Sequence, residues 1–229
     1  MSLGYSYQLY FHRDKLWPVL QSLAGFANSL GSHHQIDIIF PDSRQLTLPF
    51  TSSYGITQEH RGWDNKTQPI YFEDTAKSIQ FNTSIYFEVD DVIEEYMQQI
   101  QEDFQIQGGE HKDWVPLRDS QNRYPIGYIY LTVSIDLNRY GGNEYRTDLI
   151  CFDFTAATTS MSLLFEKSTS IRKTFIRLLE EHEGVCCLFD DETLSGTGWL
   201  IWPGDYGQGN WEGLTKRDEL ILAKSAKQL

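Results

Sequence analysis

Cysteines and long apolar runs are both scarce in this sequence. Its 229 residues include three cysteines, Cys151, Cys186 and Cys187, all in apolar stretches. An odd number without a secretory signal argues against a disulfide framework and favours small buried thiols in a reducing compartment. No apolar run approaches the roughly 20 residues that a membrane-spanning helix needs. The first residues also lack the charged and apolar regions of a signal peptide. We therefore expect a cytoplasmic protein that does not bind a membrane.

Recognisable catalytic and cofactor motifs are absent as well. There is no Gly-x-x-x-x-Gly-Lys run, no G-x-G-x-x-G after a strand and no H-E-x-x-H. These absences argue against a P-loop, a standard Rossmann site and a zincin. The run from Ser195 to Gly198 has the wrong spacing for the G-x-S-x-G turn of a serine hydrolase. The sequence therefore predicts no cofactor and favours no known enzyme class.

Basic residues are outnumbered by acidic ones. The chain has 19 Lys and Arg against 32 Asp and Glu, which gives a formal net charge of −13. A chain this acidic repels phosphate backbones, and its basic residues form no local cluster, so we expect no nucleic-acid binding. The same charge would attract a basic protein.

Apolar residues, which make up 40% of the chain, repeat with strand and helix periods. Alternation from Ile79 to Val89 predicts a long strand, and a helix follows at Asp90-Asp91. A second alternating strand, from Ile129 to Leu137, would form a hairpin with residues 145–154. Near the N-terminus, a strand at Tyr5 to Phe11 precedes a helix that starts around Trp17.

The C-terminal third is predicted to repeat this order. A strand at Met161 to Phe165 precedes a helix capped by Ser168 or Ser170 and ended by Gly184, and two further strands follow. The order β-α-β-β thus occurs three times, loosely. We predict an α+β fold with a mainly antiparallel sheet and helices packed on one face. We expect one domain over residues 1–229, and an alternative is that it contains the sub-units 1–78, 79–160 and 161–229.

Three long polar stretches that separate these elements are rich in aromatic residues. Trp and Tyr combine a large contact area with a polar group and are frequent in binding hot spots. The other interpretation is that they fold back and cover sheet edges. As a group they form the predicted partner-binding surface: Tyr54, Trp63, Tyr71, Trp114, Tyr206 and Trp211, together with Tyr124.

Two acidic clusters are candidates for chemistry. Asp190, Asp191 and Glu192 follow a predicted strand, where a divalent metal could bind if loop histidines such as His60 or His111 came close. A hairpin turn rich in acids explains the run equally well. The run Glu180-Glu181-His182-Glu183 is interpreted as a solvated helix end, and no metal site is assigned to either cluster.

Together these patterns favour a non-enzymatic, acidic protein-binding module over an enzyme. In size, acidity and lack of motifs it is loosely similar to bacterial immunity and accessory proteins, although no residue pattern carries that likeness. The predicted partner is a protein, with a basic surface as the favoured kind. The alternative is a metal-assisted hydrolase that uses the cluster at Asp190 to Glu192. The sequence does not define an oligomeric state.

Overall fold

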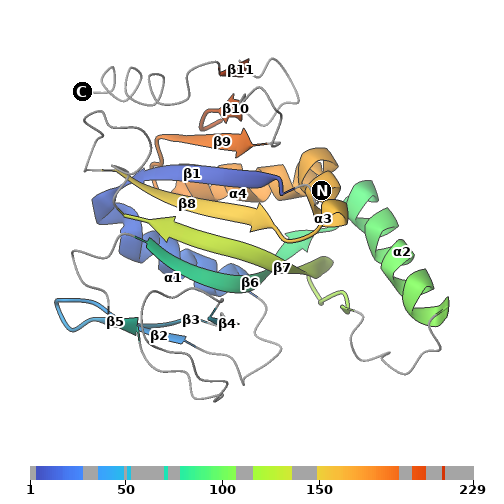
Figure 1. The fold of residues 1–229 in the computed structure, drawn as a ribbon, viewed down its shortest axis with the longest axis horizontal. Helices are drawn as coiled ribbons and strands as arrows, with labels where there is room; N and C mark the ends of the chain where they lie inside the picture. The colour runs from blue at the N-terminus through green and yellow to red at the C-terminus, as the bar shows by residue number, and fades with distance from the viewer. Residues whose placement is uncertain are drawn as a thin grey trace.

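The computed structural model describes sixteen elements between Gly4 and Leu214 (Figure 1). The structure describes residues 4–27, 36–48, 51–52, 70–71, 78–106, 116–135, 149–190, 198–204 and 213–214. The elements are β1 (Ser6–His12), η1 (Arg13–Lys15), α1 (Leu16–Phe26), β2 (Ile36–Ile39), β3 (Gln45–Leu48), β4 (Thr51–Ser52), β5 (Ile70–Tyr71), β6 (Ser78–Glu88), α2 (Asp91–Ile106), β7 (Arg123–Ser134), β8 (Leu149–Ala156), α3 (Thr159–Lys167), α4 (Thr169–Glu181), β9 (Cys186–Asp190), β10 (Gly198–Ile201) and β11 (Gly213–Leu214).

The strands form two sheets, and the N-terminal strand lies inside the larger one. The eight-stranded sheet has the order β11-β10-β9-β1-β8-β7-β6-β4, and all its pairs are antiparallel. The smaller sheet has the order β3-β2-β5 and contains the one parallel pair among these strands, β2 with β5. The predicted α+β class with a mainly antiparallel sheet is confirmed. Within the described ranges, no helix is long and apolar enough to cross a membrane.

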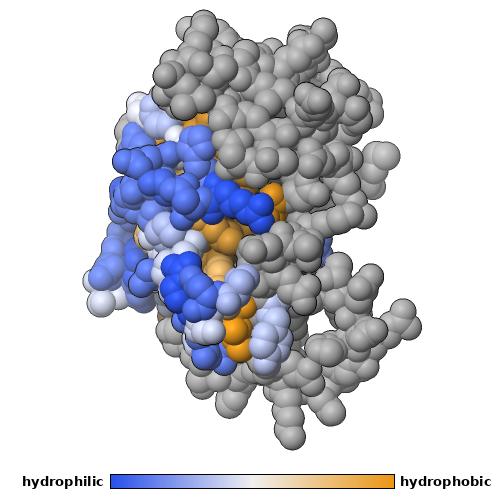
Figure 2. All heavy atoms as spheres, turned by 90° about the vertical axis from the view of Figure 1, so that its left-hand side faces the viewer, coloured by the Kyte–Doolittle hydropathy of each residue, from blue (hydrophilic) through white to orange (hydrophobic). Residues whose placement is uncertain are grey.

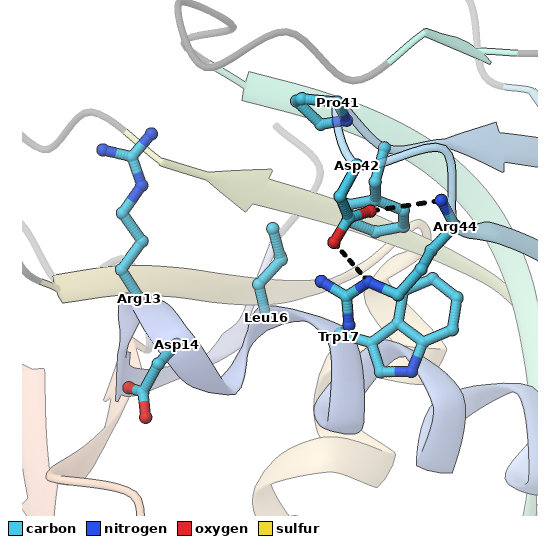
Figure 3. Close-up of a pocket in the computed structure, with 8 residues that line it drawn as sticks. Arg13, Asp14, Leu16, Trp17, Pro41, Asp42 and Arg44 are labelled. Atoms are coloured by element: carbon cyan, nitrogen blue, oxygen red, sulfur yellow. Dashed lines mark hydrogen bonds and ion pairs between the residues drawn. The ribbon is translucent and has the colours of Figure 1, made fainter.

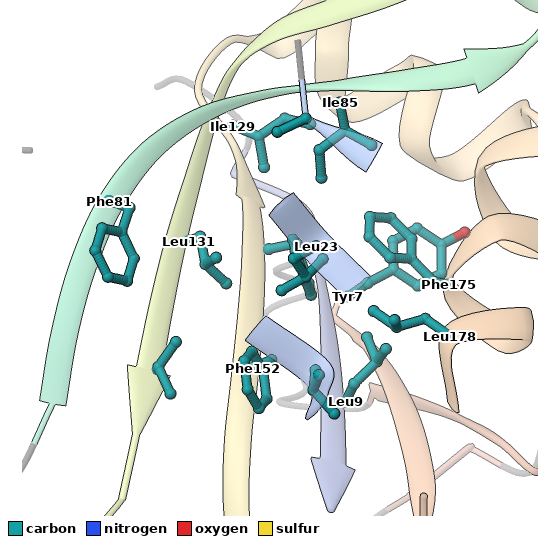
Figure 4. Packing of buried hydrophobic residues seen from close by; sticks show 14 of the residues in the cluster. Tyr7, Leu9, Leu23, Phe81, Ile85, Ile129, Leu131, Phe152, Phe175 and Leu178 are labelled. Atoms are coloured by element: carbon teal, nitrogen blue, oxygen red, sulfur yellow. The ribbon is translucent and has the colours of Figure 1, made fainter. Parts of the chain in front are cut away.

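The principal core lies between one face of the large sheet and the helices α1 and α4 (Figures 1 and 4). Alternate residues of β1, β6, β7, β8 and β9 point to this face, as the strand period requires. The Phe175 ring of α4 lies 4.8 Å from Tyr7 of β1 and 4.7 Å from Phe154 of β8, measured between ring centroids. Leu23 of α1 is also buried in this cluster. The prediction that helices pack on one face is therefore confirmed for α1 and α4.

The opposite face of the same strands carries a second, smaller hydrophobic cluster. It includes Cys151 of β8 and Cys186 of β9, while the neighbouring Cys187 points into the principal core. All three cysteines are buried and free of disulfides, as the sequence predicted. Burial raises the pKa of the Cys187 thiol well above its ordinary value. The three thiols are therefore small hydrophobic packing groups, and the raised pKa makes the Cys187 thiol poorly suited to act as a nucleophile.

The predicted strand at Met161 to Phe165 is wrong, because these residues belong to helix α3. The Thr158 hydroxyl accepts a hydrogen bond from the backbone N–H of Met161 at 3.2 Å and caps the helix. This run of five residues, four of them apolar, fits a buried strand and a buried helix turn equally well, so its periodicity did not decide between them. The third β-α-β-β unit therefore lacks its first strand, and residues 159–201 follow the order α-α-β-β instead.

Both ends of α4 have specific backbone arrangements. At its start the Ser168 hydroxyl accepts a hydrogen bond from Ile171 N at 3.1 Å, which confirms the predicted cap. At its end the left-handed residue is Glu183, with a φ of 51°, and Gly184 N donates to the Leu179 carbonyl at 2.7 Å. A Cβ atom on Gly184 would lie 2.3 Å from the Leu179 side chain. Close packing, and not a positive φ, therefore requires the glycine.

Candidate functional site

Of the six residues predicted to bind a partner, Tyr71 lies in the described part of the chain. Its side chain is 66% exposed. Tyr71 lies in the short strand β5, opposite Ile39, although the sequence predicted a loop in this stretch. An exposed tyrosine is compatible with a contact role. The other five lie outside the described residues: Tyr54, Trp63, Trp114, Tyr206 and Trp211.

Tyr124, which was grouped with these aromatic residues, has a different location. It lies in β7 opposite Phe87 and is only 7% exposed. The Arg118 guanidinium lies 5.0 Å from its ring centroid. Its assignment to a long polar stretch was wrong, because strand β7 begins at Arg123 and includes Tyr124.

The acidic cluster of the hydrolase alternative is described only at its first residue. Asp190 is the last residue of β9, is partly buried, and pairs with Ser6 of β1 and Gly198 of β10. Among the described residues, no group of three His, Cys, Asp or Glu side chains could hold a metal ion. Asp191, Glu192, His60 and His111 lie outside these residues, so the metal-assisted hydrolase stays a prediction.

His182, at the end of α4, contacts a helix from the other end of the chain. Its Nε2 atom lies 2.8 Å from the Ser22 hydroxyl of α1, and the Lys15 ammonium lies 2.5 Å from the Glu183 carboxylate beside it. Partial burial is the main cause that lowers the pKa of His182 below its usual value. It outweighs the negative charge of Glu181, which alone would raise this pKa. Glu181 and Glu183 are exposed, as expected for a solvated helix end, while His182 is half-buried against α1.

Asp90 caps two helices at once. Its Oδ1 accepts a hydrogen bond from Ile93 N of α2 at 2.9 Å. Its Oδ2 accepts from Ser170 N of α4 at 2.9 Å and from the Ser168 hydroxyl at 2.8 Å. Partial burial alone would raise the pKa of Asp90, but these hydrogen bonds hold it below the usual value. From the sequence, Asp90 was expected only at the start of one helix, where its charge opposes the helix dipole. The contact with α4 could not be predicted, because Ser168 and Ser170 lie about 80 positions further along the chain.

Helix α2 carries a concentration of negative charge that was not singled out from the sequence. No Lys or Arg occurs between Lys77 and Lys112, a stretch that contains eight acidic residues. Figure 1 shows α2 as the outermost element on its side of the fold, and α3 is its main packing neighbour. Arg118 pairs with Glu94. Three other acidic residues of α2, Asp91, Glu95 and Glu102, form no ion pair with a basic side chain in the described structure.

A cavity of about 260 Å³ opens between the start of α1 and the β2–β3 turn (Figure 3). We call it the Trp17 cavity. Figure 2 views the side of the molecule where α1 and this turn lie, and hydrophobic residues are visible there in a recess between hydrophilic ones. Eight residues line the cavity: Arg13, Asp14, Leu16, Trp17, Phe40, Pro41, Asp42 and Arg44.

Arg44 is held at the mouth of the Trp17 cavity by charge and by stacking. Its Nε lies 2.6 Å from Asp42 Oδ2, and its backbone N–H donates to Asp42 Oδ1 at 3.1 Å. Its guanidinium carbon lies 4.7 Å from the centroid of the Trp17 ring, and this ring packs edge-on against Phe40 at 4.9 Å. The hydrogen bonds from Arg44, first from its backbone, lower the pKa of Asp42.

Comparisons with known proteins add no family to this geometry. No family model matches the sequence, no curated protein matches it, and no solved structure matches the fold. The functional inference therefore depends on the surface charge of α2, the exposure of Tyr71 and the Trp17 cavity.

Proposed function

We propose that this protein is a non-enzymatic accessory module, immunity-like in its acidity, that binds a protein with a basic surface. The observation that carries the proposal is α2. Five of its sixteen residues are acidic and none is basic, and Glu95 and Glu102 are exposed. Complementary charge raises association rates and favours one class of partner over others.

The geometry of α2 supports an interface on its polar side. Ile93 and Met97 are buried and hold the helix to the fold, with exposed fractions of 0% and 1%. The exposed residues lie on the other side of the helix, where a partner could approach without displacing the core. Tyr71, on β5, is a second contact candidate, because an exposed tyrosine offers a large contact area and a hydroxyl group.

Charge reversal on α2 tests the proposal. Glu95→Lys with Glu102→Lys changes the net charge from −13 to −9, because each substitution replaces a negative charge by a positive one. The matched control is Glu166→Lys with Glu181→Lys, which makes the same change at two exposed positions of α3 and α4. We expect wild type to capture a basic protein from native lysate at low salt and to lose it at high salt, because screening weakens exposed charge pairs.

The two double variants separate a site on α2 from a general charge effect. Isothermal titration of the captured protein against each purified variant gives the affinities. Loss of affinity in the α2 variant alone supports the proposal. Equal loss in both variants, or retention in both, contradicts an interface at α2. The amide NMR spectrum of each variant confirms that the fold is kept.

A further inference from the structure

We propose that the Trp17 cavity binds a carboxylate carried on a small apolar or aromatic group. This inference is independent of the interface at α2. It depends on three features of the cavity: the fixed position of Arg44, the apolar surface below it, and the limited volume.

Arg44 is positioned before any ligand arrives. Its Nε is bound to Asp42, and its planar group lies over Trp17, so neither contact has to form on binding. In the part of the chain that the structure describes, no residue accepts a hydrogen bond from its two terminal nitrogens. Figure 3 shows this end of the guanidinium turned toward Leu16, over the cavity. Two parallel N–H groups match the two oxygens of a carboxylate, and a pre-ordered group loses little entropy on binding.

The rest of the lining selects an anion with an apolar body. Leu16 and Phe40 are buried residues that present carbon atoms to the cavity. On the side of the cavity away from Arg44, Figure 3 shows the side chains of Arg13 and Asp14 extending in opposite directions. The carboxylate of Asp42 is already engaged by Arg44 and is a poor site for a cation.

The volume limits the ligand to a single ring or side chain. Pockets for drug-sized ligands usually measure about 300–1,000 Å³, and the Trp17 cavity, at about 260 Å³, is slightly smaller. Two sources carry the required chemistry: a free aryl or alkyl carboxylic acid, and the C-terminal apolar residue of a peptide. Because few atoms can be buried, we expect a dissociation constant on the order of 1 mM.

Titration of the full chain by NMR tests the proposal, with phenylacetate as the probe and phenylacetamide as its neutral counterpart. The readouts are the indole N–H of Trp17 and the side-chain N–H of Arg44. We expect saturable shifts of both signals with phenylacetate and not with the amide. Arg44→Gln should weaken binding about tenfold or more, because the charged pair is lost. Arg177→Gln is the matched control, because Arg177 is 51% exposed against 54% for Arg44 and lies outside the cavity.

The wild-type titration alone can overturn the inference, even if Arg44→Gln loosens the turn. Equal shifts with phenylacetate and phenylacetamide, or no saturable shift with either, would refute it. Unchanged affinity in a folded Arg44→Gln variant would also refute it. The tripeptide Gly-Gly-Phe, with a free or an amidated C-terminus, distinguishes the two sources. Tighter binding of the free tripeptide than of phenylacetate identifies a peptide C-terminus, and weaker binding identifies a free acid.

Discussion

Helices α4 and α2 both have N-termini that are hydrogen-bonded to Asp90, and the two helices have different roles. In α4, seven of thirteen residues are buried, and its buried face runs along the whole helix. In α2, two of the twelve residues from Asp91 to Glu102 are buried, and the exposed positions are acidic or amide side chains. Helix α4 therefore packs against the sheet along its length, whereas the polar side of α2 is exposed and is the interface proposed above. Substitutions in α4 should change stability, and substitutions on the polar side of α2 should change binding.

The largest expected effect is at the centre of the α4 face. Phe175→Ala should lower the free energy of unfolding by about 3–5 kcal/mol, because it leaves a cavity among four aromatic rings. Urea unfolding followed by circular dichroism measures the change. The exposed neighbour Lys173→Ala is the control and should change stability by no more than about 0.5 kcal/mol. A loss below about 1 kcal/mol for Phe175→Ala would mean that α4 does not hold the core.

Removing the shared cap should destabilise both helices. Asp90→Ala should cost roughly 2–4 kcal/mol, because both N-termini lose hydrogen bonds to a carboxylate. Hydrogen exchange should then show faster exchange of the first amides of α2 and of α4. Faster exchange in α2 alone would show that the contact with Ser170 contributes nothing to α4.

The same aspartate should make stability depend on pH in the acid range. The pKa of Asp90 is lower in the folded state, so its contribution is present above the unfolded value, near 3.9, and is lost as the pH falls through the folded value. Wild type should therefore lose more stability between pH 5 and pH 3 than Asp90→Asn does. The test is a series of urea midpoints for both proteins. Parallel curves would contradict a lowered pKa at Asp90.

A smaller effect is expected at the other end of α4. Ser22→Ala removes the partner of His182 and should cost about 1 kcal/mol at pH 7. Burial lowers the pKa of His182 in the folded state, so wild type should also become less stable as the pH falls below about 6.5. Thermal unfolding at pH 7.5 and pH 5.5 measures both effects. His182→Gln should reduce the pH difference, and an unchanged difference would assign it to other groups.

The smallest effect on stability is expected on the polar side of α2. Glu95→Gln with Glu102→Gln should change the free energy of unfolding by no more than about 0.5 kcal/mol, since both side chains are exposed. Urea unfolding measures this, with Met97→Ala as the control that should destabilise, because Met97 is 1% exposed. A large loss in the double variant would show that the acidic side of α2 is structural, which would weaken its assignment as an interface.

Local patterns correctly predicted the elements in which the apolar periodicity extends over many residues. Strand β6 was found because alternation over eleven residues has no helical counterpart. Helix α3 was missed because its apolar run is short and its cap, Thr158, carries no acidic residue three positions later to complete a capping box. The charge of α2 could have been found by counting, since the absence of Lys and Arg from 34 consecutive residues is visible in the sequence.

Contacts between distant residues could not be predicted in this way. Arg44 and Trp17 are 27 positions apart, and Ser22 and His182 are 160 positions apart. Each of these pairs depends on how two elements pack, which no local pattern specifies. The predicted partner-binding aromatics illustrate the same limit, because loop composition alone placed buried Tyr124 in the same group as exposed Tyr71.

The central position of β1 has a consequence for protein synthesis. Its two neighbours, β8 and β9, end at Ala156 and Asp190, so a ribosome releases the first strand long before the segments that flank it. At about 5–20 residues per second, the interval between His12 and Asp190 is roughly 10–40 s. During that time Leu9 and Phe11, which are buried in the folded protein, lack the strand β8 that later pairs with them. Chaperones that bind emerging apolar segments are therefore expected to act on the segment that contains β1 until β8 and β9 have been synthesised.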